Sequence, residues 1–422
     1  MKNLFKNKRV TVMGLGLLGG GVGVARFFIK QRAKVLVTDL KTKSELKESL
    51  KKLKGLPIKF VLGRHRKEDF IKADLVIKNP GVPPDSRYLK IAKKHKIPIK
   101  NDVSIFFDLT KAEIIGVTGT KGKSTVATLI YLFLKRKYPN VVLAGNIGLT
   151  PLEVLSKAKK GTKVVLELSS FELEDLKKSP KVAVITTLFP DHLNRYRSFR
   201  EYVEAKKPIF KYQKKNDILV LNYNNSETRK LARSTRSKVY FFKDSNVSAA
   251  ILVAKLFKIS KRDIKKVLAG FKGVPNRQEF ITEKRGVKYF NDTTATTPQS
   301  VILAIKTFKK KFPNSEIILI AGGQDKNLNY KSLAKEIQKQ VNHLVLLPGT
   351  ASGKLKKELE LFKKESKIKI FNVKSMKEAV KKASGITKRG DLVLLSPGAA
   401  SFNLFKNEFD RGEQFVKAVK KL

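Results

Sequence analysis

The chain alternates over nearly its whole length between short apolar runs and longer segments in which lysines are spaced between apolar residues at helical intervals. Strands that alternate with helices predict parallel sheets covered by helices on both faces, which is an α/β fold. The runs with the composition of buried strands are 9–13, 34–38, 74–78, 114–118, 164–168, 182–187, 218–221, 317–321, 344–347 and 392–395. Ligands of such sheets bind beyond the carboxyl ends of the strands, so we expect the chemistry in the loops that follow these runs.

The length and composition indicate a protein of several domains that stays inside the cell. A chain of 422 residues exceeds one compact core, and breaks near Asn101 and near Val274–Asn276 predict domains at 1–101, 102–273 and 274–422. The absence of cysteine excludes disulfides, thiolate metal sites and cysteine nucleophiles. No run approaches the roughly 20 apolar residues that span a bilayer, and the basic N-terminus leads into a strand rather than a signal peptide. We therefore expect a cytoplasmic protein without a membrane span.

The charge is strongly positive, because 90 Lys and Arg face 36 Asp and Glu, for a net charge of +54. Polycations bind nucleic acids by displacing counterions from the phosphates. The lysines, however, are spread along helical faces, and the chain has no long basic tail and no basic segment interleaved with aromatic residues. We interpret the positive charge as that of lysines on solvent-exposed helix faces, and we expect no nucleic-acid partner. A basic, nucleotide-dependent RNA-binding protein is the non-enzymatic alternative.

A first glycine loop, Gly14-Leu15-Gly16-Leu17-Leu18-Gly19, follows the first predicted strand and precedes a predicted helix. Asp39 ends the next strand, about 20 residues further on, as in dinucleotide-binding folds. Glycines there let a pyrophosphate approach a helix N-terminus, and the carboxylate suits a ribose or a base edge. Both NAD and a UDP-sugar carry a pyrophosphate, and a turn without a ligand is also possible. An NAD-dependent dehydrogenase would account only for residues 1–100.

A second glycine loop, Gly116-Val117-Thr118-Gly119-Thr120-Lys121-Gly122-Lys123-Ser124-Thr125, also lies between a strand and a helix. Amides of such a loop cradle phosphates, the lysine reaches the β- and γ-phosphates, and Ser124 can hold Mg²⁺. Val117 stands where the usual spacing places a glycine, so this is a variant of the common loop. The motif predicts ATP and Mg²⁺ as cofactors, and Glu167 after a later strand offers a second hard oxygen ligand.

The segment Gly119-Thr120-x-Gly122-Lys123-Ser124-Thr125 resembles the ATP loop of the Mur ligases and of the related folylpolyglutamate synthetases. Further similar segments follow in the order typical of that family. They are Asn79-Pro80-Gly81-Val82-Pro83, Gly145-Asn146-Ile147-Gly148, Glu167-Leu168-Ser169-Ser170-Phe171, Asp191-His192-Leu193-Asn194-Arg195, Ala205-Lys206, Asn276-Arg277, Asn291-Asp292-x-x-Ala295-Thr296, Gly322-Gly323-x-Asp325-Lys326, Ser396-Pro397-Gly398-Ala399-Ala400-Ser401-Phe402 and Phe405-Lys406-Asn407. The ordered set covers almost the whole chain. One departure is Glu172, which stands where the family usually carries glutamine.

The resemblance implies a fold and a role for each domain. Residues 1–101 would form a Rossmann-like domain for a UDP-linked substrate, residues 102–273 a central P-loop ATPase-like domain, and residues 274–422 a Rossmann-like domain for the amino acid and the nucleotide. The implied reaction joins D-glutamate to UDP-N-acetylmuramoyl-L-alanine through an acyl phosphate, in peptidoglycan precursor synthesis. The alternative is a sister ligase that adds L-alanine or a diamino acid. We expect a monomer.

The resemblance also implies residue roles. Catalysis would use Lys123, Glu167, His192 and Lys206. ATP would be bound by Gly119, Thr120, Gly122, Lys123, Ser124, Thr125, Asn246, Arg277 and Asp292. The UDP-linked substrate would be bound by Gly14, Gly16, Leu17, Thr38, Asp39, Asn79, Gly81, Asn146 and Ser169. D-Glutamate would be bound by Thr296, Lys326, Ser401 and Phe402. Metal ions would be bound by Ser124, Glu167, His192 and, as a carbamate, Lys206.

Overall fold

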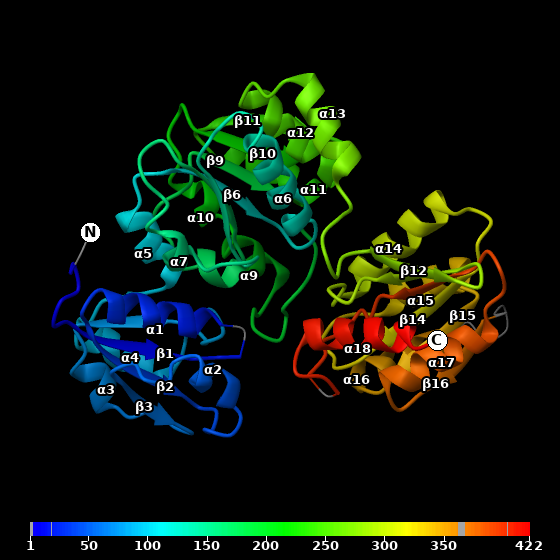
Figure 1. Cartoon of the computed structure of the whole chain (residues 1–422), viewed down its shortest axis with the longest axis horizontal. Coiled ribbons are helices and arrows are strands. Elements are labelled where there is room, and N and C mark those ends of the chain that lie inside the picture. Colours follow the sequence, from blue (N-terminus) through cyan, green and yellow to red (C-terminus); the bar gives the residue numbers. More distant parts are fainter. Residues whose placement is uncertain (1–2, 18, 362–367, 403) are drawn as a thin grey trace. The chain divides into compact units, whose positions relative to one another are not determined.

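In the computed structural model the chain forms two compact units (Figure 1). The first unit comprises Met1–Leu188 and Arg200–Gly270, and the second comprises Phe189–Phe199 and Phe271–Leu422. The described residues are 3–17, 19–361, 368–402 and 404–422. Within them, no helix has both the length and the apolar character needed to cross a membrane.

The N-terminal sheet of the first unit has the strand order β3-β2-β1-β4-β5, and its strand pairs are parallel. The elements are β1 (Arg9–Met13), α1 (Gly20–Lys30), β2 (Lys34–Asp39), α2 (Lys47–Lys51), β3 (Ile58–Leu62), α3 (Glu68–Ile71), β4 (Leu75–Lys78), α4 (Arg87–Lys94), β5 (Ile99–Lys100) and α5 (Asp102–Leu109). Val12 of β1 is paired with Val37 on one side and Ile77 on the other. Strands β2 and β3 lie on one side of β1, and the next strands, β4 and β5, lie on the other side. The loop after β1 is therefore where the strand order reverses, and such sheets bind ligands at that point.

The central sheet of the first unit has the order β11-β10-β9-β6-β8-β7, again with parallel pairs. The elements are β6 (Glu113–Thr118), α6 (Lys123–Leu134), β7 (Val141–Gly145), α7 (Pro151–Val154), β8 (Lys163–Glu167), α8 (Ser170–Leu173), β9 (Val182–Ile185), α9 (Phe199–Glu204), α10 (Pro208–Lys211), β10 (Ile218–Asn222), α11 (Ser226–Leu231), η1 (Ala232–Ser234), β11 (Lys238–Phe242), α12 (Asn246–Leu256) and α13 (Lys261–Gly270). Strand β6 lies between β9 and β8, which directs the loop after β6 into the middle of the carboxyl edge of the sheet.

Contacts between specific residues join the two sheets of the first unit. Helix α1 packs on α7 so closely that a Cβ on Gly23 would lie 2.9 Å from Thr150 Oγ1. Asn101 begins α5 with a capping box that it shares with Ser104, and its buried Nδ2 donates to the carbonyl of Glu172. An amide paired in this way costs little to bury, whereas an unpaired one would be strongly unfavourable.

The sheet of the second unit has the order β12-β13-β17-β14-β15-β16. The elements are β12 (Glu279–Lys284), β13 (Val287–Asn291), α14 (Pro298–Lys311), β14 (Ile317–Gly322), α15 (Lys331–Gln340), β15 (His343–Leu347), α16 (Thr350–Glu360), β16 (Lys369–Asn372), α17 (Met376–Ile386), β17 (Leu392–Leu395) and α18 (Glu408–Lys420). The β12–β13 pair is antiparallel, and the other pairs are parallel.

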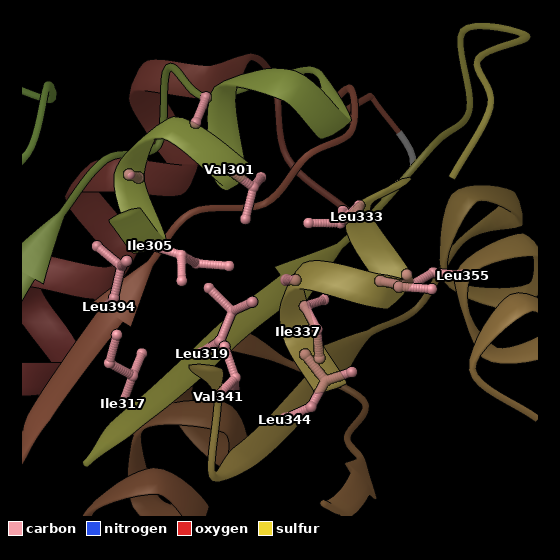
Figure 2. Packing of buried hydrophobic residues seen from close by; sticks show 14 of the residues in the cluster. Val301, Ile305, Ile317, Leu319, Leu333, Ile337, Val341, Leu344, Leu355 and Leu394 are labelled. Atoms are coloured by element: carbon pink, nitrogen blue, oxygen red, sulfur yellow. The ribbon is translucent and has the colours of Figure 1, made fainter. Parts of the chain in front are cut away.

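Helices cover both faces of this third sheet. Figure 2 shows one face, where Val301 and Ile305 of α14 meet strand residues such as Leu319. The four-residue spacing of these helical side chains sets them on one stripe, and burying that stripe attaches the helix to the sheet. On the other face, α17 and α18 contribute residues such as Val380 and Phe415.

The structure confirms the predicted α/β class with parallel sheets. Each predicted run coincides with a strand to within a few residues, and all of them lie inside their sheets. The strands that the prediction did not include are β3, β5, β7, β11, β12, β13 and β16. All but β13 form the edge of a sheet. An edge strand is covered less completely, so its sequence can carry polar residues that interrupt the apolar run, as in β12 and β16. The edge strand β7 is apolar throughout, so its composition does not explain why it was missed.

Candidate active site

The loop after β1 is closed by a carboxylate from the next strand. Asp39 Oδ2 accepts hydrogen bonds from the backbone N–H groups of Leu15, at 2.8 Å, and Gly16, at 3.0 Å. Its Oδ1 accepts from the N–H of Lys41 at 2.9 Å. Bonds from amides to a charged acceptor are among the stronger hydrogen bonds in proteins. Asp39, expected to contact a ribose or base, therefore holds the loop in shape in this structure.

The glycines of this loop serve distinct purposes. Gly14 has φ +90°, and Gly19 at the N-cap of α1 has φ +93°, both in the left-handed region that favours glycine. Gly21 does not belong to the predicted motif, yet it has the least room, because a Cβ there would lie 2.4 Å from the carbonyl oxygen of Leu15. The helix can pack against the start of the loop only because Gly21 has no side chain. Leu18 lies outside the described residues.

Further predicted residues for the UDP-linked substrate surround this loop. Asn79 follows β4, and its Nδ2 donates to the carbonyl of Gly14 at 2.8 Å. Leu17 is partly exposed on the loop, and Gly81 is exposed in the turn after Asn79. Thr38 is buried, and its Oγ1 lies 2.7 Å from Nδ1 of His65. These residues lie together at the carboxyl edge of the N-terminal sheet.

His65 was not predicted, although it is part of this edge. Its ring packs edge-on against Tyr88 at a centroid distance of 5.0 Å, and the Tyr88 hydroxyl donates to the carbonyl of His65. Burial lowers the pKa of His65 below its ordinary value, against the opposing charge of Asp39, so the imidazole is neutral near pH 7. A lone histidine in sequence gives no signal of such a site, because only the parallel pairing of β2 with β3 brings it to Thr38.

The second glycine loop, after β6, is closed by its own lysine. Gly122 is the N-cap of α6 with φ +92°, and Lys123 Nζ donates to the carbonyls of Gly119 at 3.0 Å and Thr120 at 3.2 Å. Gly119 has φ +142°, and a Cβ there would lie 2.0 Å from Thr186 Oγ1. The loop is thus a tight backbone turn with a cation inside it and a helix N-terminus beside it, which is an arrangement suited to phosphate groups. Thr125 is half-buried in the first turn of α6.

A buried hydroxyl–carboxylate pair lies beside this loop. Ser124 Oγ donates to Glu167 Oε2 at 2.6 Å, and both side chains are fully buried. Asn146 Nδ2 reaches Glu167 Oε1 at 3.5 Å. No group of three or more His, Asp or Glu side chains gathers as a metal site anywhere among the described residues. One carboxylate and one hydroxyl nevertheless fit Mg²⁺, which takes few protein ligands and completes its shell with water and phosphate oxygens.

Asn246, predicted to bind ATP, touches the same loop. It begins α12, and a Cβ added to Gly122 would lie 2.3 Å from its Oδ1. Ser169 is the N-cap of α8, and its hydroxyl donates to Glu172 Oε2 at 2.6 Å. Both residues thereby sit at the carboxyl edge of the central sheet, as predicted for loops that follow its strands.

Lys206 is not a surface lysine, since only 2% of it is exposed. Its Nζ lies 3.4 Å from the carbonyl of Gly119, and it stands 4.5 Å from the centre of the Tyr202 ring. The Tyr202 hydroxyl in turn donates to Thr120 Oγ1 at 3.3 Å. Lys206 and Tyr202 therefore belong to the wall of the ATP loop.

The buried carboxyl groups of Glu172 and Asp102 lie near this site, since Glu172 accepts from the Ser169 hydroxyl. Burial and then the charge of Asp102 raise the pKa of Glu172 to about 8. Burial raises the pKa of Asp102 to about 6, although its own and the neighbouring backbone N–H groups oppose the shift. Two buried acids that interact cannot both ionise easily. Glu172 therefore keeps its proton at neutral pH and resembles an amide in its hydrogen bonding.

In the second unit, the predicted nucleotide residues flank the end of β13. Asp292 is fully buried, and its oxygens accept from the N–H of Gln278 and from the Ser396 hydroxyl, each at 3.2 Å. The backbone of Asn276 and Gln278 has positive φ, which turns the chain around Arg277. Arg277 is half-buried next to this turn. The structure thus brings Asp292 and Arg277 to the same edge of the third sheet.

Lys326 is the cation of this second group. Its Nζ donates to Thr296 Oγ1 at 3.0 Å and to Asp191 Oδ1 at 3.3 Å. Burial would raise the pKa of Asp191, but Lys326, His192 and the His192 N–H together hold it below its ordinary value. His192 has φ +55° and lies 3.5 Å from Asp191 through its Nε2. His192 therefore belongs to the second unit with Lys326, whereas Glu167 and Lys206 belong to the first.

Ser401 has an unused hydrogen-bonding group. It is 2% exposed, and among the described residues its Oγ finds no hydrogen-bond partner. A buried polar atom without a partner is costly and calls for a ligand or an ordered water. Phe402 next to it is 73% exposed, which leaves its ring open to a ligand or solvent.

Arg411 supports this loop and was not predicted. It is fully buried in α18, and its guanidinium donates to the carbonyls of Thr293, at 2.8 Å, and Ala399, at 3.1 Å, and to Thr293 Oγ1 at 3.1 Å. Burial lowers its pKa to about 10, so it stays charged at neutral pH. Its spacing was a usable signal, because Arg411 shares one helical stripe with Phe415 and Val419.

Three family models match successive parts of the chain. They are the Mur ligase MurD-like N-terminal domain over residues 8–101, the Mur ligase middle domain over residues 117–274, and the Mur ligase, glutamate ligase domain over residues 276–398. Two curated relatives carry the name UDP-N-acetylmuramoylalanine--D-glutamate ligase. The protein from Roseiflexus sp. (strain RS-1) is 40% identical, and the one from Borreliella afzelii (strain PKo) is 39% identical; each alignment covers 98% of both chains.

Solved structures share the fold. UDP-N-acetylmuramate-alanine ligase MurC from Thermotoga maritima matches with a TM-score of 0.63 at 21% identity, over 98% of this chain and 100% of that one. MurF ligase from Thermotoga maritima, in complex with ADP, matches with a TM-score of 0.61 at 18% identity, over 100% of both chains. The family models and the full-length relatives agree with the glycine loops and their surroundings, and the chain belongs to the Mur ligase family.

Proposed function

We propose that this chain is an ATP-dependent ligase that joins D-glutamate to UDP-N-acetylmuramoyl-L-alanine in peptidoglycan precursor synthesis. The observation that carries the proposal is the full-length likeness to ligases named for that reaction, at up to 40% identity. The polar groups around both glycine loops and around Lys326 suit a reaction between two anions that needs charge neutralisation.

Lys123 is the proposed catalytic cation of the ATP site. Its ammonium already lies inside the loop on the carbonyls of Gly119 and Thr120, and those two neutral acceptors can be exchanged for phosphate oxygens. Ser124 and Glu167 would hold Mg²⁺, which supplies charge neutralisation on the phosphates. Asn246, Arg277 and Asp292 are the proposed contacts of the nucleoside part.

The proposed reaction has two steps. The terminal carboxylate of UDP-N-acetylmuramoyl-L-alanine attacks the γ-phosphorus of ATP, which forms an acyl phosphate and releases ADP. The amine of D-glutamate then attacks the acyl carbon and gives up a proton, and the carbon–oxygen bond to phosphate breaks. Lys123 would stabilise negative charge on the transferred phosphoryl group, since phosphoryl transfer depends mainly on positioning and electrostatics.

Lys326, Thr296, Ser401 and Phe402 are the proposed D-glutamate pocket. The ammonium of Lys326 suits a carboxylate, and the unpartnered hydroxyl of Ser401 can donate to one. His192 and a carbamate formed from Lys206 and CO₂ are the proposed supports of a second metal ion. The burial of Lys206 beside the Gly119 carbonyl is consistent with a structural role there.

The N-terminal domain, residues 1–101, is proposed to bind the UDP-linked substrate through Gly14, Gly16, Leu17, Thr38, Asp39, Asn79 and Gly81, with Asn146 and Ser169 on its muramoyl part. Residues 102–273 would bind ATP, and residues 274–422 the amino acid and part of the nucleotide. We propose a cytoplasmic monomer without a nucleic-acid partner.

The test is phosphate release from ATP and Mg²⁺ with UDP-N-acetylmuramoyl-L-alanine, when D-glutamate, L-alanine, L-lysine or no amino acid is added in separate reactions. We expect release that depends on D-glutamate. Preference for another amino acid would favour the sister-ligase alternative, and no release above the ATP-only background, with or without bicarbonate, would contradict a ligase function.

A further inference from the structure

Lys78 is a fully buried cation that no step of the proposed reaction uses. It is the last residue of β4, and only 1% of it is exposed. Its Nζ donates to Glu174 Oε1 at 2.8 Å and forms an ion pair with Asp175 Oδ2 at 2.5 Å. Lysine is almost never buried this completely unless its charge is paired, so the contact with Glu174 and Asp175 makes this burial possible.

The two ends of this ion pair belong to different sheets of the first unit. Lys78 directly precedes the Asn79–Gly81 turn of the N-terminal sheet, and that turn is bound to the Gly14 carbonyl through Asn79. Glu174 is the C-cap of α8, the short helix that Ser169 begins after the buried Glu167. The ion pair therefore connects the loops proposed to bind the UDP part with those proposed to bind the muramoyl part.

A second contact on the same helix supports this geometry. The buried Nδ2 of Asn101 donates to the carbonyl of Glu172, so α8 is attached to the N-terminal part of the chain at two points. The Asn101 contact lies next to the connection between the two sheets, whereas the Lys78 contact lies at the edge where the loops gather. Two separated attachments resist rotation of one sheet against the other better than one does.

We propose that Lys78, through Glu174 and Asp175, is a positioning residue that sets the distance between the two halves of the sugar-nucleotide site. This inference rests on the proposed function for the identity of the substrate. Lys78 is too deeply buried to contact a ligand itself, so it acts through the Asn79–Gly81 turn and α8. A small displacement between two binding loops lowers affinity for a ligand that must reach both, whereas ATP is proposed to be held within the central sheet and by residues of the second unit.

The test uses Lys78→Met, which keeps an unbranched side chain without its charge, together with Glu174→Gln and the double variant. The measurements are equilibrium binding of UDP-N-acetylmuramoyl-L-alanine, the KM for that substrate and for ATP, and kcat. We expect the Kd and KM of the sugar nucleotide to rise about tenfold or more in Lys78→Met, with the KM for ATP and kcat changed by less than about threefold. Glu174→Gln should give a smaller effect because Asp175 still faces Lys78. The double variant should fall short of the product of the two single effects, since both remove the same interaction.

The matched control is Arg9→Met at the opposite end of the same strands. Arg9 begins β1 and pairs with Asp74, which directly precedes β4, but the two side chains are 58% and 31% exposed. This variant should leave every kinetic constant unchanged, because an exposed ion pair contributes little.

The inference would be overturned by an unchanged Kd for the sugar nucleotide in Lys78→Met, or by equal losses for the sugar nucleotide and ATP, which would indicate a general folding defect. Melting curves and the milder Glu174→Gln variant keep the test decisive if Lys78→Met folds poorly. Failure of the proposed function would give a different result, because the wild-type protein itself would then neither bind UDP-N-acetylmuramoyl-L-alanine nor release phosphate in its presence.

Discussion

The two glycine loops of the first unit have the same backbone plan but are closed by opposite charges. Each connects a central parallel strand to a helix, and each helix has a glycine N-cap in the left-handed region, Gly19 at φ +93° and Gly122 at φ +92°. In the first loop a carboxylate, Asp39, accepts the loop amides. In the second an ammonium, that of Lys123, donates to the loop carbonyls.

This difference separates a scaffold from a reacting site. The Asp39 carboxylate already occupies the amides of Leu15 and Gly16, so a phosphate there would have to use amides nearer the N-terminus of α1. In the second loop no carboxylate takes this place: the Thr120 amide donates to the carbonyl of Thr187 at 2.7 Å, and the cation rests on neutral carbonyls that phosphate oxygens can replace. Glycine spacing alone does not distinguish the two loops, because the carboxylate that closes the first loop comes from the next strand, whereas the second loop is closed by its own lysine.

The substitution Lys123→Ala is the most severe test of the difference between the two glycine loops. If the second loop is the reacting one, removing its cation should lower kcat by about 10²- to 10³-fold, the range for losing one preorganised electrostatic contact. The measurement is D-glutamate-dependent phosphate release. Lys135→Ala, at the exposed C-cap of the same helix, is the control and should retain normal activity. Activity of Lys123→Ala within a few-fold of wild type would remove the distinction between the loops.

The buried acidic pair of Glu172 and Asp102 near the second loop predicts a pH effect on stability. The pKa of Glu172 is about 8 in the folded protein, against 4.5 ordinarily. Between these values the unfolded chain loses the proton that the folded chain keeps, so stability falls as pH rises from about 4.5 to about 8. Glu172→Gln, which mimics the neutral acid, should therefore be more stable than wild type by on the order of a few kcal/mol at pH 8.5.

The two proteins should approach equal stability near pH 5. The measurement is denaturant unfolding at both pH values. A stability difference that does not depend on pH would show that Glu172 is ionised throughout, contrary to the effect of its burial.

The closeness of helix and strand at the first loop is tested by two neighbouring glycines. Gly21→Ala places a Cβ 2.4 Å from the Leu15 carbonyl oxygen, and the resulting overpacking should destabilise the protein by about 1–3 kcal/mol. Gly20→Ala is the matched control, because its nearest neighbour would be Asn79 Oδ1 at 3.9 Å. Thermal unfolding should separate the two variants clearly, and equal melting temperatures would contradict the packing described for α1.

The smallest expected effect is that of Asp39→Asn. The substitution preserves shape but removes the charge that strengthens two amide hydrogen bonds, so the first loop should loosen by about 1 kcal/mol. We expect a KM for the UDP-linked substrate raised several-fold and an unchanged KM for ATP, measured in the same phosphate-release assay. A change in the KM for ATP instead would show that the two loops do not act separately.

Much of the fold could be predicted because central strands of parallel sheets are buried on both faces. The run Leu392–Leu395 is apolar throughout and coincides with β17, and the run Ile114–Thr118, which is apolar up to its final threonine, lies within β6. Strand β11 escaped prediction because it is an edge strand whose residues are mostly exposed. Strand β13 was missed although β12 and β17 flank it on both sides, and its lysine and asparagine interrupt the apolar pattern.

The candidate site divides in the same way. The glycine loops follow directly from local sequence, and the Ser124–Glu167 pair follows from the rule that loops after parallel strands meet at one edge. His65 and Lys78 gave no comparable signal, because each is paired with groups far away in the chain, whereas Arg411 was marked only by its place on the buried stripe of its helix. The role of a single polar residue depends on partners that its own segment does not contain.

By itself, the sequence determined the class of fold, the positions of the two phosphate-type loops and the family, because strand burial, helical periodicity and glycine spacing are local properties. Only the tertiary structure decided which charge closes each loop, that Lys78 joins the two sheets and that Lys326 meets Asp191 and Thr296. The physical reason is that a polar side chain can be buried only where a partner satisfies it, and that partner is supplied by the packing of distant segments.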